Sequence, residues 1–315
     1  MNEKRCLFCY QLLAIGQVDF HPACSQKMFG QDLAPLLYFE ENELESLGIQ
    51  VVRSRTTVTG VQPKLSLDLK KATDTDTQKR FTLVGLWGSY ILKPPGPAYP
   101  FLPEVEDLTM HLAETTGLKV VPHSLIRLKS GALAYITKRI DRQKNKKIHM
   151  EDFCQITNRL AEQKYQGSYE QIGKAILTYS EFPGLDAMRF FELVLFSFLT
   201  GNADMHLKNF SLIQQSGNQY VLSPAYDLVA TKIVNPLDLE EMALTLNGRK
   251  REIKRSDFEA FSKTLKLSTR QMDQVFSKMQ ESKEKWSYLI QISFIPLGMK
   301  EKLLNLIEDK FLVLY

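Results

Sequence analysis

The stretch DAMRFFELVLFSFLTGNADMHLKNF, residues 186–210, decides the fold, because a strongly apolar run ends in a cluster of polar groups. The run carries only three charged side chains before Gly201, which predicts a buried helix and not a membrane span. Asp204 and Asn209 follow with the spacing D-x4-N. Taken alone this spacing is a weak indication, because Asp and Asn are also common in ordinary turns.

The same spacing occurs in the catalytic loop of protein kinases. There the Asp accepts the proton of the acceptor hydroxyl, and the Asn holds a magnesium ion. Asp227, in SPAYDL (223–228), lies beyond a strand-like hairpin, where a second metal-binding Asp of a kinase falls. A carboxylate and an amide supply the hard oxygen ligands that suit Mg²⁺ bridging phosphates. Lys208, inside the first motif, could neutralise the transferred phosphate.

Two further elements that a kinase needs lie upstream in the expected order. Gly60, in TTVTGVQPKLSL, opens a strand as a phosphate-binding loop does. Lys93, in SYILKPP, ends an apolar strand and precedes a helix that carries Glu104 and Glu106. A strand lysine paired with a helix glutamate holds nucleotide phosphates in kinases. A surface lysine on a strand explains Lys93 equally well when that residue is taken alone.

The pattern of hydrophobic residues predicts strands first and helices later. Residues 51–95 alternate apolar and polar side chains in short runs, which predicts a small antiparallel meander. A helix is expected over residues 31–50 and another over 104–120, and a hairpin is expected around Lys129–Gly131. From residue 151 onward the pattern is mainly helical.

This order predicts an α+β, two-lobed protein-kinase-like fold with a small β-rich N-lobe and a larger helical C-lobe. We expect a Cys/His arm at 1–30, the N-lobe at 31–150 and the C-lobe at 151–315. Motifs of ordinary eukaryotic kinases are missing: G-x-G-x-x-G, H-R-D, D-F-G and A-P-E do not occur, and neither does a Walker P-loop. The sequence therefore argues against an ordinary eukaryotic-type kinase.

Composition places the chain among soluble globular proteins. It has 315 residues, 44% hydrophobic and 24% charged, and a net charge of +4 that decides nothing about nucleic-acid binding. No apolar stretch is long enough for a membrane span, and the first residues lack the apolar core of a signal peptide. We therefore expect a cytoplasmic protein with reduced thiols and no membrane partner.

Three of the four cysteines lie near the N-terminus with a histidine, as C-x2-C-x11-H-x2-C: Cys6, Cys9, His21 and Cys24. Two close pairs separated by a loop are typical of a tetrahedral Zn²⁺ site. A short arm with three incidental thiols is the alternative. Cys154 stands alone and is expected to be a buried small apolar residue.

A collinear set of motifs resembles the HipA-type Ser/Thr kinases, the toxins of bacterial toxin–antitoxin operons. The resemblance covers about residues 50–255 and is specific because the order of the motifs is unbroken. The motifs are TGVQPK (59–64), YILKPP (90–95), HLAETTGL (111–118), YITKRIDR (135–142), EDFCQ (151–155), GNADMHLKNFSL (201–212), SPAYDL (223–228) and MALTLNGRK (242–250).

The resemblance implies ATP and Mg²⁺ as cofactors, with Asp204 as the catalytic Asp and Asn209 and Asp227 as magnesium ligands. It also implies a phosphate-proximal loop, a phosphate lysine with its glutamate, an adenine hinge and two side chains that border the nucleotide. The loop consists of Gly60, Val61, Gln62 and Lys64, and the lysine and its glutamate are Lys93 and Glu106. The hinge consists of Glu151, Asp152 and Phe153, and the side chains that border the nucleotide are His206 and Tyr226. His206 fits equally well as a side chain that orders its loop by hydrogen bonding.

Members of this family autophosphorylate a serine just before the glycine loop. The candidates here are Ser54, Thr56, Thr57 and Thr59. The family position, three residues before the glycine, is Thr57, and Ser54 competes with it because Arg53 and Arg55 flank it and could bind the phosphate. Added phosphate in this segment would pull the loop away from ATP.

About 50 residues precede the glycine loop, which resembles the short HipT-like form of a three-gene system. The implied partners are a helix-turn-helix antitoxin, a small HipS-like subdomain protein and, through the antitoxin alone, DNA. The implied substrate is an aminoacyl-tRNA synthetase. Two other functions stay open: a non-catalytic, pseudokinase-like subunit that binds an antitoxin, and a small-molecule kinase of the same fold.

Overall fold

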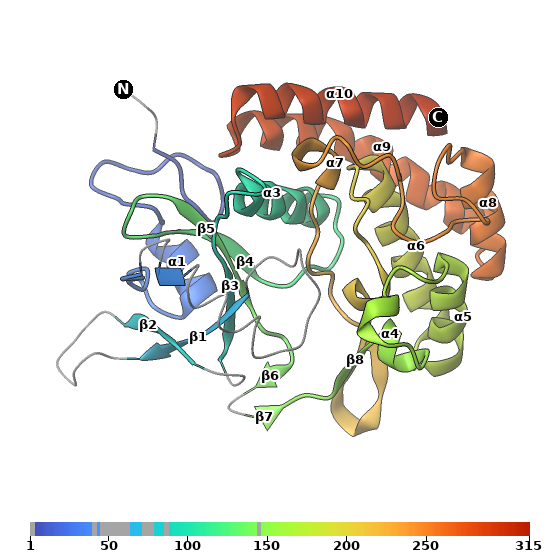
Figure 1. Cartoon of the computed structure of the whole chain (residues 1–315), viewed down its shortest axis with the longest axis horizontal. Coiled ribbons are helices and arrows are strands. Elements are labelled where there is room, and N and C mark those ends of the chain that lie inside the picture. The colour runs from blue at the N-terminus through green and yellow to red at the C-terminus, as the bar shows by residue number, and fades with distance from the viewer. Residues whose placement is uncertain (1–3, 40–42, 45–63, 71–78, 85–87, 144–145) are drawn as a thin grey trace. The chain divides into compact units, whose positions relative to one another are not determined.

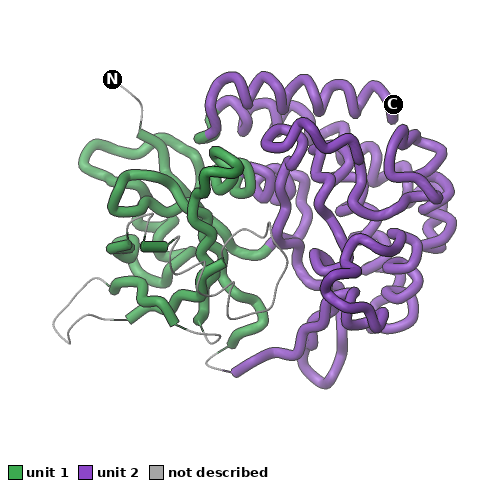
Figure 2. The backbone as a smooth tube through the Cα atoms, viewed as in Figure 1, with its two compact units in different colours: residues 1–107, 121–145, 292–294 green, residues 108–120, 146–291, 295–315 purple. Residues whose placement is uncertain are grey.

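A computed structural model describes residues 4–39, 43–44, 64–70, 79–84, 88–143 and 146–315. The chain divides into two compact units (Figure 2). Unit 1 holds residues 1–107, 121–145 and 292–294, and unit 2 holds residues 108–120, 146–291 and 295–315. Within the described part of the chain, no helix combines the length and the apolar character needed to cross a membrane.

Unit 1 is built on a five-stranded antiparallel sheet with the order β2-β1-β3-β5-β4 (Figure 1). The predicted strands and the hairpin at Lys129–Gly131 are confirmed, but the simple meander is wrong, because β1 lies between β2 and β3. Alternation along β1 places Leu65 and Leu67 in the core, opposite Leu92 and Tyr90 of β3. The strands are β1 (Leu65–Lys70), β2 (Arg80–Leu83), β3 (Tyr90–Lys93), β4 (His123–Arg127) and β5 (Leu133–Lys138).

The N-terminal segment packs on this sheet. Helix α1 (Pro22–Phe29) begins with a proline, whose missing N–H costs a helix start nothing, and ends at Gly30 in the left-handed conformation (φ 72°). Phe29 packs edge-on against Phe81 of β2, with ring centroids 5.8 Å apart. The segment and the sheet therefore share one core.

The helix expected over 31–50 is wrong for the described residues 31–39. Leu36 forms a parallel bridge with Arg80 there, and its N–H donates to the carbonyl of Lys79 (3.3 Å). Pro35 explains the difference, because proline in a helix interior removes a hydrogen bond and clashes with the preceding turn. Residues 43–44 are helical.

Helix α3 (Leu102–Thr115) confirms the helix expected after Lys93. It is followed by Gly117, whose φ of +84° suits the left-handed position at a helix end. Its first turns, through Asp107, belong to unit 1 and carry the two candidate glutamates.

Unit 2 combines a three-stranded sheet, β10-β9-β8, with helices. Strands β9 and β10 form the hairpin predicted between the two metal-ligand motifs. The elements are β8 (Met150–Asp152), α4 (Phe153–Ile156), α5 (Tyr169–Tyr179), α6 (Pro183–Leu199), β9 (Ser211–Gln214), β10 (Tyr220–Leu222), α7 (Thr231–Val234), α8 (Arg255–Thr264), α9 (Thr269–Ile292) and α10 (Leu297–Leu314).

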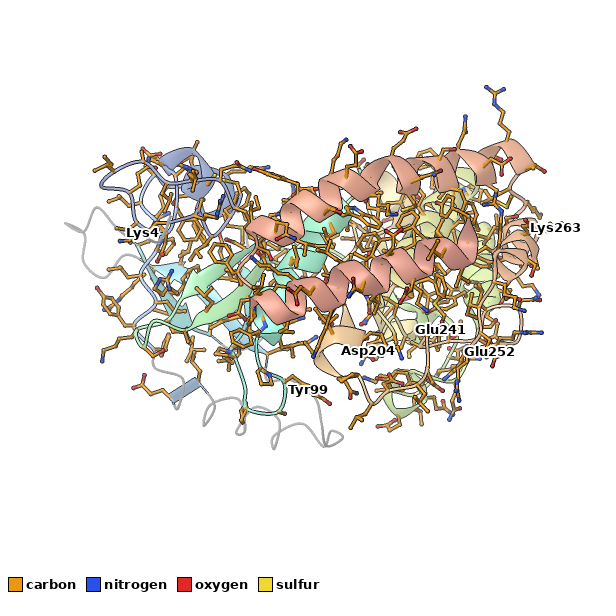
Figure 3. All side chains as sticks on the ribbon, turned by 90° about the horizontal axis from the view of Figure 1, so that it is seen from above. Lys4, Tyr99, Asp204, Glu241, Glu252 and Lys263 are labelled. Carbon is orange, nitrogen blue, oxygen red and sulfur yellow. The ribbon has the colours of Figure 1, made fainter. Side chains whose placement is uncertain are left out.

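Helix α6 is the centre of unit 2 and is buried on nearly every side from Phe190 to Leu199, as its apolar sequence predicts. Phe190 packs edge-on against Phe210 and Phe261, at centroid distances of 5.1 and 5.8 Å. Helices α9 and α10 lie side by side in both views (Figures 1 and 3), and Trp286 contacts Phe311 between them. This core holds the end of α6, where the Asp204 motif begins.

Candidate active site

The Asp204 loop starts at a glycine that the backbone requires. Gly201 follows the C-cap of α6 with φ +67°, and a Cβ there would lie 2.9 Å from the side chain of Leu306. The next residues are tied to Thr231, whose hydroxyl accepts from the N–H of Ala203 (2.9 Å) and donates to the carbonyl of Gly201 (3.2 Å). The start of the loop that presents Asp204 is therefore tied to α7; Figure 3 labels Asp204.

Asn209 is fixed relative to Asp204 by a hydrogen bond within the motif. Its side-chain Nδ2 donates to the backbone carbonyl of Asp204 over 2.9 Å, and its backbone N–H donates to His206 (2.9 Å). With the amide nitrogen used in this way, Oδ1 is the side-chain atom that can serve as a metal ligand. The spacing of five residues thus sets a carboxylate and an amide oxygen in one short turn.

Asp227 occupies a strained position on the loop after β10. Its φ is +62°, a left-handed conformation that costs a non-glycine residue about 1–2 kcal/mol. Tyr226 beside it lies within hydrogen-bonding distance of the Ser211 hydroxyl (2.5 Å) and donates to the carbonyl of Lys208 (3.0 Å). Tyr226 thus ties the Asp227 loop to the Asp204 motif, and burial raises the pKa of its phenol. Whether its ring borders a nucleotide stays a prediction.

His206 is a buried residue of the Asp204 loop. Burial lowers the pKa of its ring to about 4, although the carboxylates of Asp204 and Asp227 act in the opposite direction. Both carboxylates therefore act electrostatically on one imidazole. Among the described residues, Nδ1 of His206 has no hydrogen-bond partner, so a loop-ordering hydrogen bond from that atom is not found there.

Tyr165 is a site residue that the sequence did not reveal. Its hydroxyl donates a hydrogen bond of 2.6 Å to Oδ1 of Asp204, and its ring packs edge-on against His206 with centroids 5.0 Å apart. Burial, together with the Asp204 carboxylate, raises the pKa of the phenol. Nothing local marks a tyrosine 39 positions upstream in a polar loop, so sequence patterns could not have found it.

Lys93 and Glu106 form a buried ion pair in unit 1. Nζ of Lys93 contacts Oε1 of Glu106, and both side chains are buried. The lysine nitrogen also lies 5.3 Å from the ring centroid of Tyr135, where a cation–π attraction is favourable. Of the two predicted glutamates, Glu106 is thus the partner, whereas burial raises the pKa of Glu104 to about 7.

The predicted adenine hinge forms the start of α4. Asp152 caps this helix, accepting from the N–H of Gln155, while its own N–H donates to the Gln155 side chain. Phe153 is fully buried and donates its N–H to the carbonyl of Phe210 (3.1 Å), whereas Glu151 on β8 is half-buried and lies near His149. These backbone donors are used inside unit 2, so a hinge contact from Asp152 or Phe153 would have to come from a carbonyl.

The remaining predicted residues fall into three groups. Lys64 is exposed and directly precedes β1. The rest of the glycine loop and all candidate phosphorylation sites lie outside the described residues: Gly60, Val61, Gln62, Ser54, Thr56, Thr57 and Thr59. Cys6, Cys9, His21 and Cys24 are brought together in unit 1, with one ligand atom of each within 4.8 Å of the others.

A sheet with a buried lysine–glutamate pair in one unit, and a helical second unit with the Asp204–Asn209 turn and Asp227, define a two-lobed protein-kinase-like fold. Comparison with known proteins agrees, so the predicted fold class is confirmed. Residues 56–286 match the family model described as the HipA-like C-terminal domain. The chain belongs to this HipA-type kinase family.

Three relatives carry the description "putative kinase". A Haemophilus influenzae protein is 30% identical over 267 residues, which is 76% of each chain. Two proteins of Sinorhizobium fredii, Y4dM and Y4mE, are 37% and 29% identical, over 47% and 62% of this chain. The matched regions span 38% and 47% of those two relatives, less than half of their length.

Two solved structures share the fold. HipA of Shewanella oneidensis, determined in complex with HipB and its operator DNA, has a TM-score of 0.65 at 19% identity and is matched over 94% of this chain and 79% of its own. The Helicobacter pylori proinflammatory kinase CtkA has a TM-score of 0.54 at 17% identity, over 78% of this chain and 92% of its own.

Proposed function

We propose that this protein is a cytoplasmic serine/threonine protein kinase that uses ATP and Mg²⁺. The observation that carries the proposal is the hydrogen bond from Asn209 to the backbone of Asp204, which sets one carboxylate and one amide oxygen in a fixed relation. A turn that only ended α6 would not need Asp227 as well, whose neighbour Tyr226 donates a hydrogen bond to Lys208 in the Asp204 motif. Phosphoryl transfer needs a carboxylate that faces the acceptor hydroxyl together with oxygen ligands for the metal ion.

The donor set fits a magnesium ion. Oδ1 of Asn209 and the carboxylate of Asp227 are the residues that would hold it, and both offer hard oxygen ligands. When bound, Mg²⁺ neutralises charge on the β- and γ-phosphates. His206 is neutral at physiological pH because burial lowers its pKa to about 4, so it adds no competing positive charge.

The remaining residues follow from their geometry in each unit. Lys93, held by Glu106, would contact the nucleotide phosphates. Asp204 would orient the acceptor hydroxyl and take its proton as the oxygen bonds to the γ-phosphorus, while the bond from that phosphorus to the bridging oxygen breaks and ADP leaves. Catalysis is then positioning and charge stabilisation without a covalent enzyme intermediate.

The test is transfer of labelled phosphate from ATP by the purified chain in the presence of Mg²⁺. We expect Asp204→Asn and Asp227→Asn each to reduce transfer by at least about 100-fold while leaving the thermal unfolding midpoint near that of the wild type. Asp309→Asn, an exposed position on α10, is the matched control and should transfer normally. Transfer by Asp227→Asn at the wild-type rate would refute the metal assignment.

The same experiment separates the two alternative functions. A pseudokinase-like subunit would transfer no phosphate from ATP to itself or to added protein. A small-molecule kinase would label only an added metabolite. Labelling of a serine or threonine, mapped by mass spectrometry, is the outcome that the protein-kinase proposal requires.

We also propose that the protein is the toxin of a toxin–antitoxin system and is regulated by autophosphorylation within residues 54–59. Support comes from the family and from the Shewanella HipA, which was solved with HipB and operator DNA. The proposed partners are a helix-turn-helix antitoxin, which would provide the only link to DNA, and a HipS-like protein; the proposed substrate is an aminoacyl-tRNA synthetase. Induced expression should arrest growth, and Asp204→Asn should abolish the arrest.

A further inference from the structure

The four N-terminal candidate ligands converge although they come from two separate segments. Cys6 and Cys9 lie in one turn, and His21 and Cys24 lie at the start of α1. Sγ of Cys9 is 3.4 Å from Nδ1 of His21, and Sγ of Cys24 is 3.7 Å from the same nitrogen. A tetrahedral Zn²⁺ with ordinary bond lengths places a sulfur and a nitrogen ligand about 3.6 Å apart. The observed spacing therefore matches that of zinc ligands.

The histidine is already oriented for a metal by its second nitrogen. Nε2 of His21 lies 3.0 Å from the backbone carbonyl of Leu12. A carbonyl only accepts, so Nε2 carries the proton and Nδ1 presents its lone pair to the two sulfurs. A hydrogen bond from the other ring nitrogen to a carbonyl is the usual support of a metal-bound histidine.

The backbone around Cys6 supports a metal-binding turn. The N–H of Tyr10 donates to the carbonyl of Cys6 over 2.9 Å, which closes the turn that holds both thiols. Cys6 is fully buried. Incidental surface thiols would need neither the closed turn nor the burial of Cys6.

We propose that Cys6, Cys9, His21 and Cys24 bind one Zn²⁺ in a closed structural site, and that this site holds Tyr10 against Asp107. The proposal concerns residues 4–30, which lie outside the matched family region, and it is independent of the proposed kinase activity. Three cysteines and one histidine complete the four ligands of a tetrahedral structural site, so no position remains for catalysis at the metal.

The second part of the proposal rests on Tyr10, which follows a ligand directly. Tyr10 is fully buried, has a strained φ of +64°, and donates its hydroxyl to Oδ2 of Asp107 over 2.8 Å. The other oxygen of Asp107 lies 2.7 Å from Nδ1 of His123 on β4. Asp107 is the neighbour of Glu106, the partner of Lys93. The zinc site thus braces the turn of α3 that presents Glu106.

Metal analysis of the full-length protein, expressed with zinc in the medium, tests the site. We expect about one zinc per chain. After exchange with Co²⁺ we expect the visible bands of a tetrahedral, thiolate-ligated ion. Zinc well below one per chain, or a disulfide among the three cysteines found by mass spectrometry, would overturn the proposal.

Variants distinguish these ligands from other thiols. Cys6→Ser and His21→Ala should each lower zinc affinity at least about tenfold, whereas Cys24→His should keep the metal, because histidine is an equivalent ligand. Cys154→Ala is the matched control and should keep full zinc content. A loss of zinc in Cys154→Ala equal to that in Cys6→Ser would contradict the assignment.

Hydrogen exchange tests the brace without any kinase assay. Chelation of zinc from the full-length protein should speed amide exchange in residues 102–107 and 123–127 and leave residues 269–290 of unit 2 unchanged. Tyr10→Phe should retain one zinc and still speed exchange in residues 102–107, because only the bond to Asp107 is lost. The proposed contact between the zinc site and α3 would be overturned by either of two results. One is amide exchange at residues 102–107 that is unchanged in both experiments, and the other is faster exchange that also includes residues 269–290.

Discussion

The hydroxyl of Tyr165 donates a hydrogen bond of 2.6 Å to Oδ1 of Asp204. An acceptor hydroxyl would have to donate to this carboxylate in the same way for phosphate transfer. Under the role proposed for Asp204, Tyr165 occupies the position of a substrate hydroxyl, and its side chain would have to turn away before a serine or threonine could bind there. Tyr165 is partly exposed, and such a movement would give up its edge-on contact with the buried ring of His206.

The first prediction follows from this competition. Tyr165→Phe should lower the KM for the protein acceptor about fivefold without lowering kcat, because a partly exposed hydrogen bond to a carboxylate contributes about 1 kcal/mol. Steady-state kinetics with varied acceptor concentration measure both constants. Tyr179→Phe, an exposed tyrosine on α5, is the control. A fall in kcat at constant KM would instead mean that Tyr165 assists Asp204.

The second prediction separates stability from function at the Lys93–Glu106 pair. Lys93→Met leaves a buried carboxylate without its lysine and should reduce the free energy of unfolding by about 3–5 kcal/mol. The double variant Lys93→Met/Glu106→Leu replaces both charges with apolar groups and should recover most of that loss. Urea unfolding measures each free energy.

The double variant also tests the role of the lysine. We expect it to be stable and yet to lack the rise in melting temperature that ATP and Mg²⁺ give the wild type, since the phosphate contact is gone. An ATP-dependent shift equal to that of the wild type would show that the pair only stabilises unit 1.

The third prediction concerns pH. Burial lowers the pKa of His206 to about 4 from an unfolded value near 6.5, so the unfolded chain binds the proton more strongly. The stability from this neutral side chain is complete above about pH 6.5 and is lost as the pH falls toward 4. Lowering the pH from 7.5 to 5 should therefore reduce the unfolding free energy of the wild type by about 2 kcal/mol through this residue. Over the same pH range His206→Gln should lose about 2 kcal/mol less of its unfolding free energy than the wild type, as measured by urea unfolding at each pH.

The sequence predicted those parts of the site that depend on local spacing. Asp204, Asn209 and Asp227 come together because five residues form one turn and a short hairpin returns the chain, and both features are legible in order along the chain. The Lys93–Glu106 pair was found for the same reason, since a strand end and the next helix are neighbours in sequence.

Contacts between distant segments could not be predicted in this way. Tyr165 reaches Asp204 from 39 residues away, and no periodicity encodes that approach. The place of β1 between β2 and β3 is likewise a choice among pairings that the same alternating pattern allows. Pro35 by itself opposes the helix predicted over residues 31–39, so the sequence contains the reason for that difference.

The fourth prediction concerns the turn that starts the Asp204 loop. Gly201→Ala should destabilise the protein by about 1–3 kcal/mol, because φ is +67° and the new Cβ would approach Leu306 to 2.9 Å. Phosphate transfer should fall further than the loss of folded protein explains. Gly298→Ala on α10, where a Cβ meets nothing within 4 Å, should leave both quantities unchanged.

The last prediction distinguishes positioning from metal binding at Asn209. Asn209→Asp keeps an oxygen ligand but replaces the amide that donates to the Asp204 carbonyl with an acceptor, and the side chain is buried. We expect a loss of about 1–3 kcal/mol in stability and a lower kcat that added Mg²⁺ does not restore, because the turn itself is displaced. Asn209→Ser removes both the amide donor and the Oδ1 ligand, so its kcat should fall further, and added Mg²⁺ should not restore it. Full recovery of Asn209→Asp in high Mg²⁺ would show that the hydrogen bond to Asp204 has no positioning role.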